Sequence, residues 1–284
     1  MMRSIAGSGK VARTRLLSST PTPTRAAVFA IASEVVEYDS VSKIEVGGLT
    51  SSSFITHCPS TEFRGLSTAE FGAAAAALRV GALSRVIVSS PNPLLAARLW
   101  WLFISYGLPA HVLEGPWLTD PGGERENRLR ERNRDKTIEG DARKGGVWTP
   151  KPVVGAVVTT AEVLSAVARG VQLIDVRTPA EYAGIDLRSN KRGGHIPGAL
   201  NMPWTDLLDK DTGEWRGQSG LREVFEKAGI DVSRPAIVIC QAGIRATAGV
   251  LALRALGAPL AGNYVGAMQE YLSDPSLPVI SGTK

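Results

Sequence analysis

Cys240 and Arg245 are the residues of this chain whose types and spacing best suit chemistry, because they bracket a very short loop. The thiolate is the reactive form of cysteine, and a nearby positive charge favours the thiolate over the thiol. The guanidinium of Arg245 would also attract an anionic substrate toward the sulfur. We therefore predict that Cys240 is a nucleophile and that Arg245 and the loop bind an anion. The loop residues in question are Gln241, Ala242, Gly243 and Ile244.

The residues on either side of this loop predict a strand and a helix. Residues 236–239 are apolar and mostly β-branched, which is typical of a short buried strand in a parallel sheet. Residues 245–256 are rich in alanine and leucine and are followed by Gly257, which predicts a largely buried helix. Cys240 would then lie at the sheet edge where α/β proteins bind ligands, beside the N–H groups of a helix start. The alternative is a buried cysteine that acts as a small apolar core residue.

Three ordered motifs in residues 153–280 resemble those of the rhodanese family of sulfurtransferases. Residues 240–246 (CQAGIRA) resemble the active-site loop of the family. Residues 173–182 (LIDVRTPAEY) resemble the strand and helix start that open a rhodanese domain, and residues 194–199 (GHIPGA) resemble its second signature. From this resemblance we expect an α/β fold of two rhodanese-like domains, each an open, mainly parallel sheet flanked by helices.

The resemblance implies that Cys240 attacks the outer sulfur of a small anionic donor, thiosulfate being the expected one. The resulting persulfide would pass its sulfur to cyanide, a small thiol or a protein thiol, for example that of a thioredoxin-like protein. Arg188 and Arg192 lie where arginines of the family reach the substrate anion, although a solvated charged loop is the alternative. Asp175 and Arg177 are expected to support the active loop or, alternatively, to form a surface ion pair with each other. No metal or organic cofactor is expected.

Some residues depart from the family's pattern and leave the donor open. In comparison with the thiosulfate enzymes that the chain resembles, Glu181 replaces a substrate-binding arginine. Gln241 and Ala242 replace basic loop residues of those enzymes. The 3-mercaptopyruvate enzymes carry Ser or Thr and small residues rather than Gln241 and Arg245. The alternatives to a thiosulfate sulfurtransferase are therefore a 3-mercaptopyruvate sulfurtransferase and a non-enzymatic persulfide carrier or regulatory module.

Two other chemistries fit the sequence less well. Cysteine phosphatases also place a cysteine and an arginine at a helix start. They resemble a rhodanese-like protein whose loop is one residue longer than the loop of this chain. His195 could act as a general base, but in its Gly-His-Ile-Pro-Gly context we expect a turn residue.

Residues 34–118 predict a first α/β domain, with a strand at residues 85–90 and a helix at residues 94–106. Its order of elements resembles the N-terminal domain of tandem rhodaneses. The position of the catalytic cysteine falls at Ser89 or Ser90, and a hydroxyl group cannot form a persulfide. We therefore predict a degenerate rhodanese-like domain that packs against the active one.

A charged linker is predicted at residues 119–152, between this domain and the catalytic domain at residues 153–284. The run from Glu124 to Lys144 mixes eight basic with six acidic residues, which indicates a solvated connector rather than an RNA-binding arm. Trp100 and Trp101, on an apolar helix, are predicted to lie in the core or at the domain interface rather than to stack on bases. The other helix predicted in the first domain spans residues 68–78, and residues 34–39 could form a strand.

Residues 1–33 contain five basic and no acidic residues and are rich in serine, threonine and alanine, which is typical of a mitochondrial transit peptide. A plastid transit peptide or a cytoplasmic protein with a disordered N-terminus is the alternative. We exclude this segment from the predicted fold. Its charge equals the net charge of +5 of the whole chain, so the remaining body is neutral and predicts no nucleic-acid partner.

The remaining composition is that of a globular protein without a disulfide framework. No apolar run approaches the ~20 residues that cross a bilayer, so we expect no membrane association. The two cysteines, Cys58 and Cys240, are too few for a disulfide framework and predict a reducing compartment. We expect a monomer.

Overall fold

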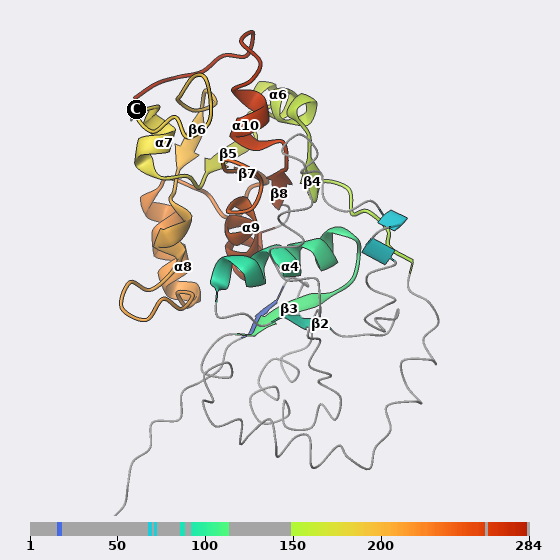
Figure 1. Cartoon of the computed structure of the whole chain (residues 1–284). Coiled ribbons are helices and arrows are strands. Elements are labelled where there is room, and N and C mark those ends of the chain that lie inside the picture. Colours follow the sequence, from blue (N-terminus) through green and yellow to red (C-terminus); the bar gives the residue numbers. More distant parts are fainter. Residues whose placement is uncertain are drawn as a thin grey trace, which may run out of the picture.

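The computed structural model describes most of the second half of the chain and parts of the first (Figure 1). The described residues are 16–18, 68–69, 71–72, 86–88, 92–113, 149–258 and 261–282.

Five parallel strands form the sheet that carries Cys240 at one of its ends. Their order across the sheet is β4-β8-β7-β5-β6, and every neighbouring pair runs parallel. The strands are β4 (Val157–Val158), β5 (Gln172–Asp175), β6 (Ala199–Asn201), β7 (Ala236–Ile239) and β8 (Ala261–Tyr264). Strands β5 and β7 are buried along their whole length, which explains their nearly continuous apolar sequences.

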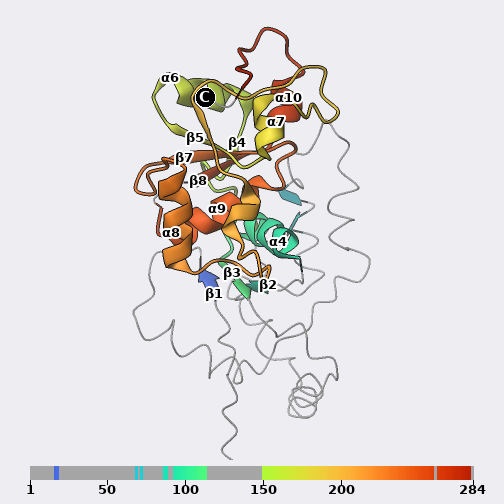
Figure 2. The same cartoon turned by 90° about the vertical axis from the view of Figure 1, so that its left-hand side faces the viewer.

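Helices cover both faces of this sheet (Figure 2). Helices α6, α7 and α10 lie on one face, and α8 and α9 lie on the other. Their bounds are α6 (Thr160–Ala168), α7 (Pro179–Ala183), α8 (Gln218–Lys227), α9 (Ala246–Ala255) and α10 (Ala267–Tyr271), with a 3-10 helix η2 (Trp204–Leu207) after β6. The prediction of an α/β fold with a mainly parallel sheet flanked by helices is confirmed for this domain.

Helix α9, which follows the Cys240 loop, is buried from Ala246 to Leu253. It lies between the sheet and helix α4 (Pro93–Ser105), so it meets protein on both sides (Figure 2). This position requires a helix that is apolar all round, which explains its alanine- and leucine-rich sequence.

A second, three-stranded sheet lies on the far side of α4 (Figure 2). Its strands are β1 (Leu16–Ser18), β2 (Val86–Val88) and β3 (Ala110–Leu113). The order is β1-β3-β2, with β2 parallel and β1 antiparallel to β3. Strand β1 lies within residues 1–33, which the predicted fold excludes. That exclusion is based on the composition of the segment, which does not indicate so short a strand. The transit peptide itself stays a prediction.

The prediction for Trp100 and Trp101 is confirmed. Both side chains are buried on α4, and Trp100 Nε1 donates a hydrogen bond to the carbonyl of Ala110, 3.1 Å away. They belong to one apolar cluster that also contains the inner face of α9. The two halves of the described chain therefore share a core.

Most predicted boundaries are off by one residue, and α6 shows why. Two adjacent threonines, Thr159 and Thr160, stand at its start. The cap is Thr159, whose hydroxyl accepts from the backbone N–H of Glu162 while the Glu162 carboxylate accepts from Thr159. The Thr160 hydroxyl instead bonds to Tyr264 and Glu270. Either threonine can cap a helix, and only the tertiary contacts decide between them.

Several predictions fall outside the described residues. These are the strand at residues 34–39, most of the helix at residues 68–78, the serines Ser89 and Ser90, and nearly all of the linker. Within the described residues, no helix has the length and apolar character that crossing a bilayer requires.

Gly249 tests the packing of α9 on the sheet. A Cβ at this position would lie 2.8 Å from Val238 Cγ1 and 3.2 Å from Val176 Cγ1. We expect Gly249→Ala to lower the free energy of unfolding by about 1–3 kcal/mol through overpacking, as measured by urea denaturation.

Gly220 in α8 provides the matched control, because the three atoms nearest to a Cβ there all belong to the Arg216 side chain. Gly220→Ala should leave stability unchanged or raise it by up to about 1 kcal/mol, since alanine is the better helix former. Equal effects of the two substitutions would contradict tight packing at Gly249.

Candidate active site

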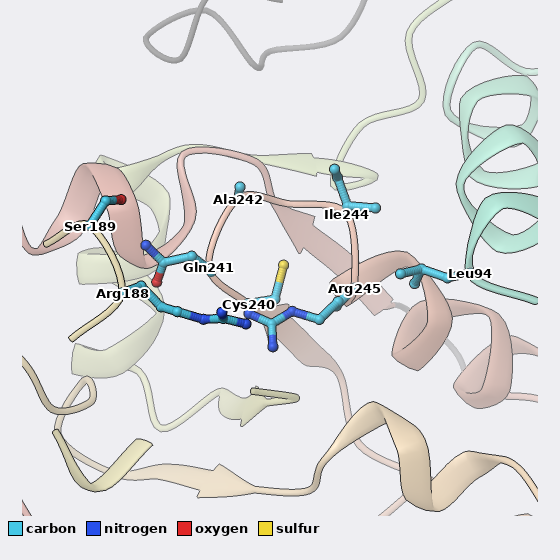
Figure 3. A pocket seen from close by; sticks show the side chains of 8 residues that line it. All are labelled: Leu94, Arg188, Ser189, Cys240, Gln241, Ala242, Ile244 and Arg245. Atoms are coloured by element: carbon cyan, nitrogen blue, oxygen red, sulfur yellow. The ribbon is translucent and has the colours of Figure 1, made fainter. Parts of the chain in front are cut away.

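Cys240 follows the last residue of β7 and is 1% exposed. The chain then curves around its sulfur atom before α9 begins at Ala246 (Figure 3). Gly243 makes this curve possible with a φ of +73°, and a Cβ there would lie 3.0 Å from the carbonyl oxygen of Val265. The predicted place of Cys240, between a buried strand and a buried helix, is confirmed.

The carbonyl groups of this loop are held away from the sulfur. The backbone N–H groups of Met268 and Gln269, in α10, donate to the carbonyls of Cys240 and Gln241 at 2.9 and 3.0 Å. At the other end of the loop, the carbonyl of Ile244 accepts from Thr247 through both its N–H and its hydroxyl.

Asn263 on β8 completes this arrangement from beneath the loop. It is fully buried, and its Nδ2 donates to the carbonyl of Gly243 at 2.9 Å. Sequence analysis did not select Asn263, because a single asparagine in a short strand carries no local signal. Its contact depends on β8 lying beside β7.

These bonds determine where the loop N–H groups point. In a trans peptide each N–H points opposite to the carbonyl of the preceding residue. Within the part of the chain that the structure describes, none of the N–H groups of residues 241–246 donates a hydrogen bond to the protein. The loop therefore offers a set of unpaired donors around the sulfur, which suits a negative charge.

Ala267 contributes to this geometry through its backbone. It has a φ of +55°, a conformation that costs a non-glycine residue about 1–3 kcal/mol. It immediately precedes Met268 and Gln269, whose N–H groups hold the loop carbonyls. The strain thus lies at the turn that directs α10 toward the loop.

Two arginines and one glutamate lie beside the sulfur. Arg245 donates from Nη1 and Nη2 to the two carboxylate oxygens of Glu181, each at 2.7 Å. Arg188 Nε donates to the same carboxylate at 3.2 Å. The guanidinium groups of Arg188 and Arg245 point toward one another beneath Cys240 (Figure 3).

Glu181 is fully buried and ionised. Burial raises its pKa, but the hydrogen bonds and charge of Arg245, the N–H of Thr178 and the Arg188 hydrogen bond outweigh this and lower the pKa from 4.5 to about 2. Burial likewise lowers the pKa of Arg245, but Glu181 and the charge at Cys240 raise it above its ordinary value. We predicted that Arg245 would bind the substrate anion, and its partner within the structure is Glu181.

The structure separates the two arginines predicted to bind substrate. Arg188 lines the pocket at Cys240, and its Nη atoms have no hydrogen-bond partner among the described residues. Arg192 does not reach the pocket. Its guanidinium donates instead to backbone carbonyls at the end of α10 and in the segment that follows, namely those of Tyr271, Leu272, Asp274 and Leu277.

Asp175 and Arg177 form a buried ion pair rather than the surface pair that we considered. Arg177 Nη2 lies 2.7 Å from Asp175 Oδ2, and both side chains are 1% exposed. The same Nη2 donates to the carbonyl of Gly194 at 2.9 Å. The pair therefore supports the Gly194–His195 turn, and no hydrogen bond joins it to the Cys240 loop among the described residues.

His195 has a structural environment, as its predicted role in a turn requires. Its ring stacks on Tyr182 with 3.6 Å between the ring centroids, and Nδ1 lies 2.9 Å from the carbonyl oxygen of Tyr182. Its backbone pairs with Ile280 in both directions. The ring is 1% exposed and does not line the pocket.

A pocket of about 590 Å³ opens at Cys240. Its wall contains the predicted loop residues except Gly243, together with Arg188 and two residues that we did not predict, Ser189 and Leu94 (Figure 3). Leu94 comes from the first turn of α4, so the first half of the chain contributes to the pocket. Gln241, at the pocket, exchanges two amide hydrogen bonds with Asn190. No group of His, Cys, Asp or Glu side chains arranged to hold a metal occurs among the described residues.

Comparisons with known proteins agree with this fold. Residues 159–274 match the rhodanese-like domain. The 3-mercaptopyruvate sulfurtransferase of Escherichia coli K12 is 32% identical over 196 residues, which are 68% of this chain and 66% of that protein. The thiosulfate sulfurtransferase of Corynebacterium glutamicum is 34% identical over 132 residues, 43% of each chain.

Among solved structures, wild-type EanB superimposes with a TM-score of 0.61 at 19% identity, over 78% of this chain and 56% of that one. A variant of EanB in complex with hercynine gives a TM-score of 0.63 at 19% identity, over 80% of this chain and 57% of that one. These two show the fold alone. The aligned part is less than two thirds of the length of each curated relative. The chain belongs to the rhodanese family.

The low pKa of Glu181 predicts an acid-sensitive contribution to stability. Because its pKa in the folded state, about 2, lies below its ordinary value of 4.5, the ionised carboxylate stabilises the fold above about pH 4.5. The contribution is on the order of 3 kcal/mol and decreases as the pH falls toward 2. Between pH 7 and pH 3 the wild type should therefore lose about 2 kcal/mol more unfolding free energy than Glu181→Gln, as measured by urea denaturation.

Glu162→Gln is the control, because Glu162 holds the same position in the capping box of α6 that Glu181 holds in the capping box of α7. Among the described residues, Thr159 is the only hydrogen-bond partner of the Glu162 carboxylate. That variant should keep the acid sensitivity of the wild type. If Glu181→Gln kept it too, Glu181 would not be the source.

Proposed function

We propose that this protein is a sulfurtransferase that moves a sulfane sulfur from a small anionic donor to a thiophilic acceptor through a persulfide on Cys240. The observation that carries this proposal is the loop around the sulfur, in which the N–H groups of residues 241–246 donate to no described residue of the protein. Such donors stabilise the negative charge of a thiolate or persulfide. The proposal is also consistent with the family and with the names of the relatives.

The reaction has two displacement steps. The Cys240 thiolate attacks the outer sulfur of thiosulfate, a sulfur–sulfur bond forms, and sulfite leaves with the electron pair of the broken bond. In the second step cyanide or a thiolate attacks the outer sulfur of the persulfide, and Cys240 leaves as a thiolate. The N–H groups of the loop face the sulfur in both steps, so the negative charge stays within their reach.

Arg188 is the residue that we assign to the donor anion. Its side chain is 51% exposed and its Nη atoms have no hydrogen-bond partner in the described part of the chain, whereas both Nη atoms of Arg245 are bound to Glu181. Arg245 therefore holds the loop to α7 and contributes positive charge.

Thiosulfate is the donor that we propose first, as the sequence suggested, and 3-mercaptopyruvate is the second candidate. The second is favoured by the length of the match to the Escherichia coli 3-mercaptopyruvate sulfurtransferase, which covers 68% of this chain against 43% for the thiosulfate enzyme. We propose a thiol, including one on a thioredoxin-like protein, or cyanide as the acceptor.

We propose further that the first half of the chain is a degenerate rhodanese-like domain. Its parallel pair β2 and β3 is joined by α4, the order that the active domain uses for β7, α9 and β8. The match to the Escherichia coli relative covers 196 residues, more than the family domain at residues 159–274. Its proposed work is to pack on α9 and to supply Leu94 to the pocket.

Sulfur loading of Cys240 tests the proposal directly. Incubation with thiosulfate, or separately with 3-mercaptopyruvate, should add the mass of one sulfur atom to the wild type, as seen by intact-mass analysis. Cys240→Ser should gain no sulfur from either donor, because a hydroxyl forms no persulfide. A serine variant that still gained the sulfur would refute the assignment of Cys240. Stable loading with negligible turnover of cyanide or small thiols would identify a carrier rather than an enzyme.

Arg188 and Arg192 form a matched pair for the donor contact. Arg188→Ala should lose a charge-assisted hydrogen bond of about 1.5–3 kcal/mol, which lowers the kcat/KM for the donor by about ten- to a hundredfold. Arg192→Ala should lower the melting temperature, because it frees the carbonyls of residues 271–277, but it should keep kcat/KM within about threefold. Donor kinetics that fall equally in both variants would contradict this division of roles.

A further inference from the structure

We propose that Glu181 determines which donor charge the pocket prefers, because it cancels one of the two guanidinium charges beside Cys240. This inference rests on the proposed function, since it concerns the donor of that same site. It assigns a specificity role to a residue that does not line the pocket and that we first considered only as a departure from a family pattern.

The geometry places Glu181 between the two arginines. Its carboxylate receives both Nη atoms of Arg245 at 2.7 Å and Nε of Arg188 at 3.2 Å. The remaining bonds of the carboxylate come from Thr178, through its N–H and its hydroxyl. The side chain of Glu181 is fully buried and that of Arg245 is 15% exposed, so solvent screens the charges of this pair little.

The charges around the sulfur can then be counted. Arg188 and Arg245 bring two positive charges, and Glu181 removes one of them. Asp175 and Arg177 pair with each other at 2.7 Å and add no net charge. Asp186 lies 3.6 Å from Arg188 Nε, and because these two side chains are 45% and 51% exposed, water screens both of their charges. Among the described residues, Arg188, Arg245 and Glu181 therefore carry a single net positive charge beside Cys240, and the Arg245–Glu181 pair is the buried part of this cluster.

The two candidate donors differ in charge, so this count affects them differently. Thiosulfate is a dianion, whereas 3-mercaptopyruvate carries one carboxylate charge at neutral pH. A change of one unit in the charge of the cluster acts on the dianion with twice the Coulomb energy that it exerts on the monoanion. The ratio of the kcat/KM values for the two donors therefore reports the charge of the cluster, while a general loss of activity cancels from the ratio.

Neutral substitutions at both partners form the test. Glu181→Gln adds one positive charge, and glutamine keeps the capping box with Thr178. Arg245→Gln removes one positive charge, and the double substitution restores the charge of the wild type. Initial rates of sulfur loading on Cys240 with each donor at pH 7 give the ratio for all four proteins, and melting curves show which of them are folded.

We expect the thiosulfate-to-mercaptopyruvate ratio to rise about tenfold in Glu181→Gln and to fall about tenfold in Arg245→Gln. The double variant should lie within about threefold of the wild type, although its absolute rates will be lower. If Glu181→Gln alone does not fold, the comparison of Arg245→Gln with the double variant isolates residue 181 in the same way.

A ratio that is the same in all folded variants would overturn the proposal and leave Glu181 with a purely structural role, even if every rate fell. Failure of the wild type to take sulfur from either donor would instead overturn the proposed function. The two failures are therefore distinguishable in one set of measurements.

Discussion

The planarity of the peptide bond is the constraint on which the site depends, because a loop can turn its N–H groups inward only if its carbonyls turn outward. Outward carbonyls in a buried loop need donors of their own, since an unpaired buried carbonyl is costly. Here α10, β8 and the first turn of α9 supply them, chiefly through Met268, Gln269, Asn263 and Thr247. The anion-binding character of the loop is thus produced by the elements behind it as much as by its own sequence.

Burial of a carboxylate is the second constraint, and it connects three separate segments. An ionised group such as Glu181 is tolerated away from water only when partners compensate the lost hydration. Arg245 at the start of α9 and Arg188 in the loop after α7 provide this compensation. Neither arginine can be replaced without leaving part of a buried charge unpaired, so the loop, α7 and the segment around Arg188 must change together.

Local sequence patterns were sufficient to predict the catalytic domain's strand and helix around Cys240, because apolar strands and alanine-rich helices have strong periodic signals. They were insufficient for contacts between distant residues. Glu181 and Arg245 are separated by 64 residues, and Glu181 could be read locally only as part of a capping box. Arg188 and Arg192 are of one type in one loop, so only the fold distinguishes the arginine at the pocket from the one bound to backbone carbonyls. Leu94 reaches the pocket from the other half of the chain.

The order of strands also has a consequence for biosynthesis. Strand β8 follows Cys240 in the chain, yet it lies inside the sheet between β4 and β7. The donors of Met268 and Gln269 follow it in turn. During synthesis from the N-terminus, the cysteine therefore leaves the ribosome before the strand and helix that shape its loop. The nascent protein therefore passes through a stage in which Cys240 is present but its loop does not yet have the anion-binding conformation. The site can form only after residues 261–271 have been added and have folded.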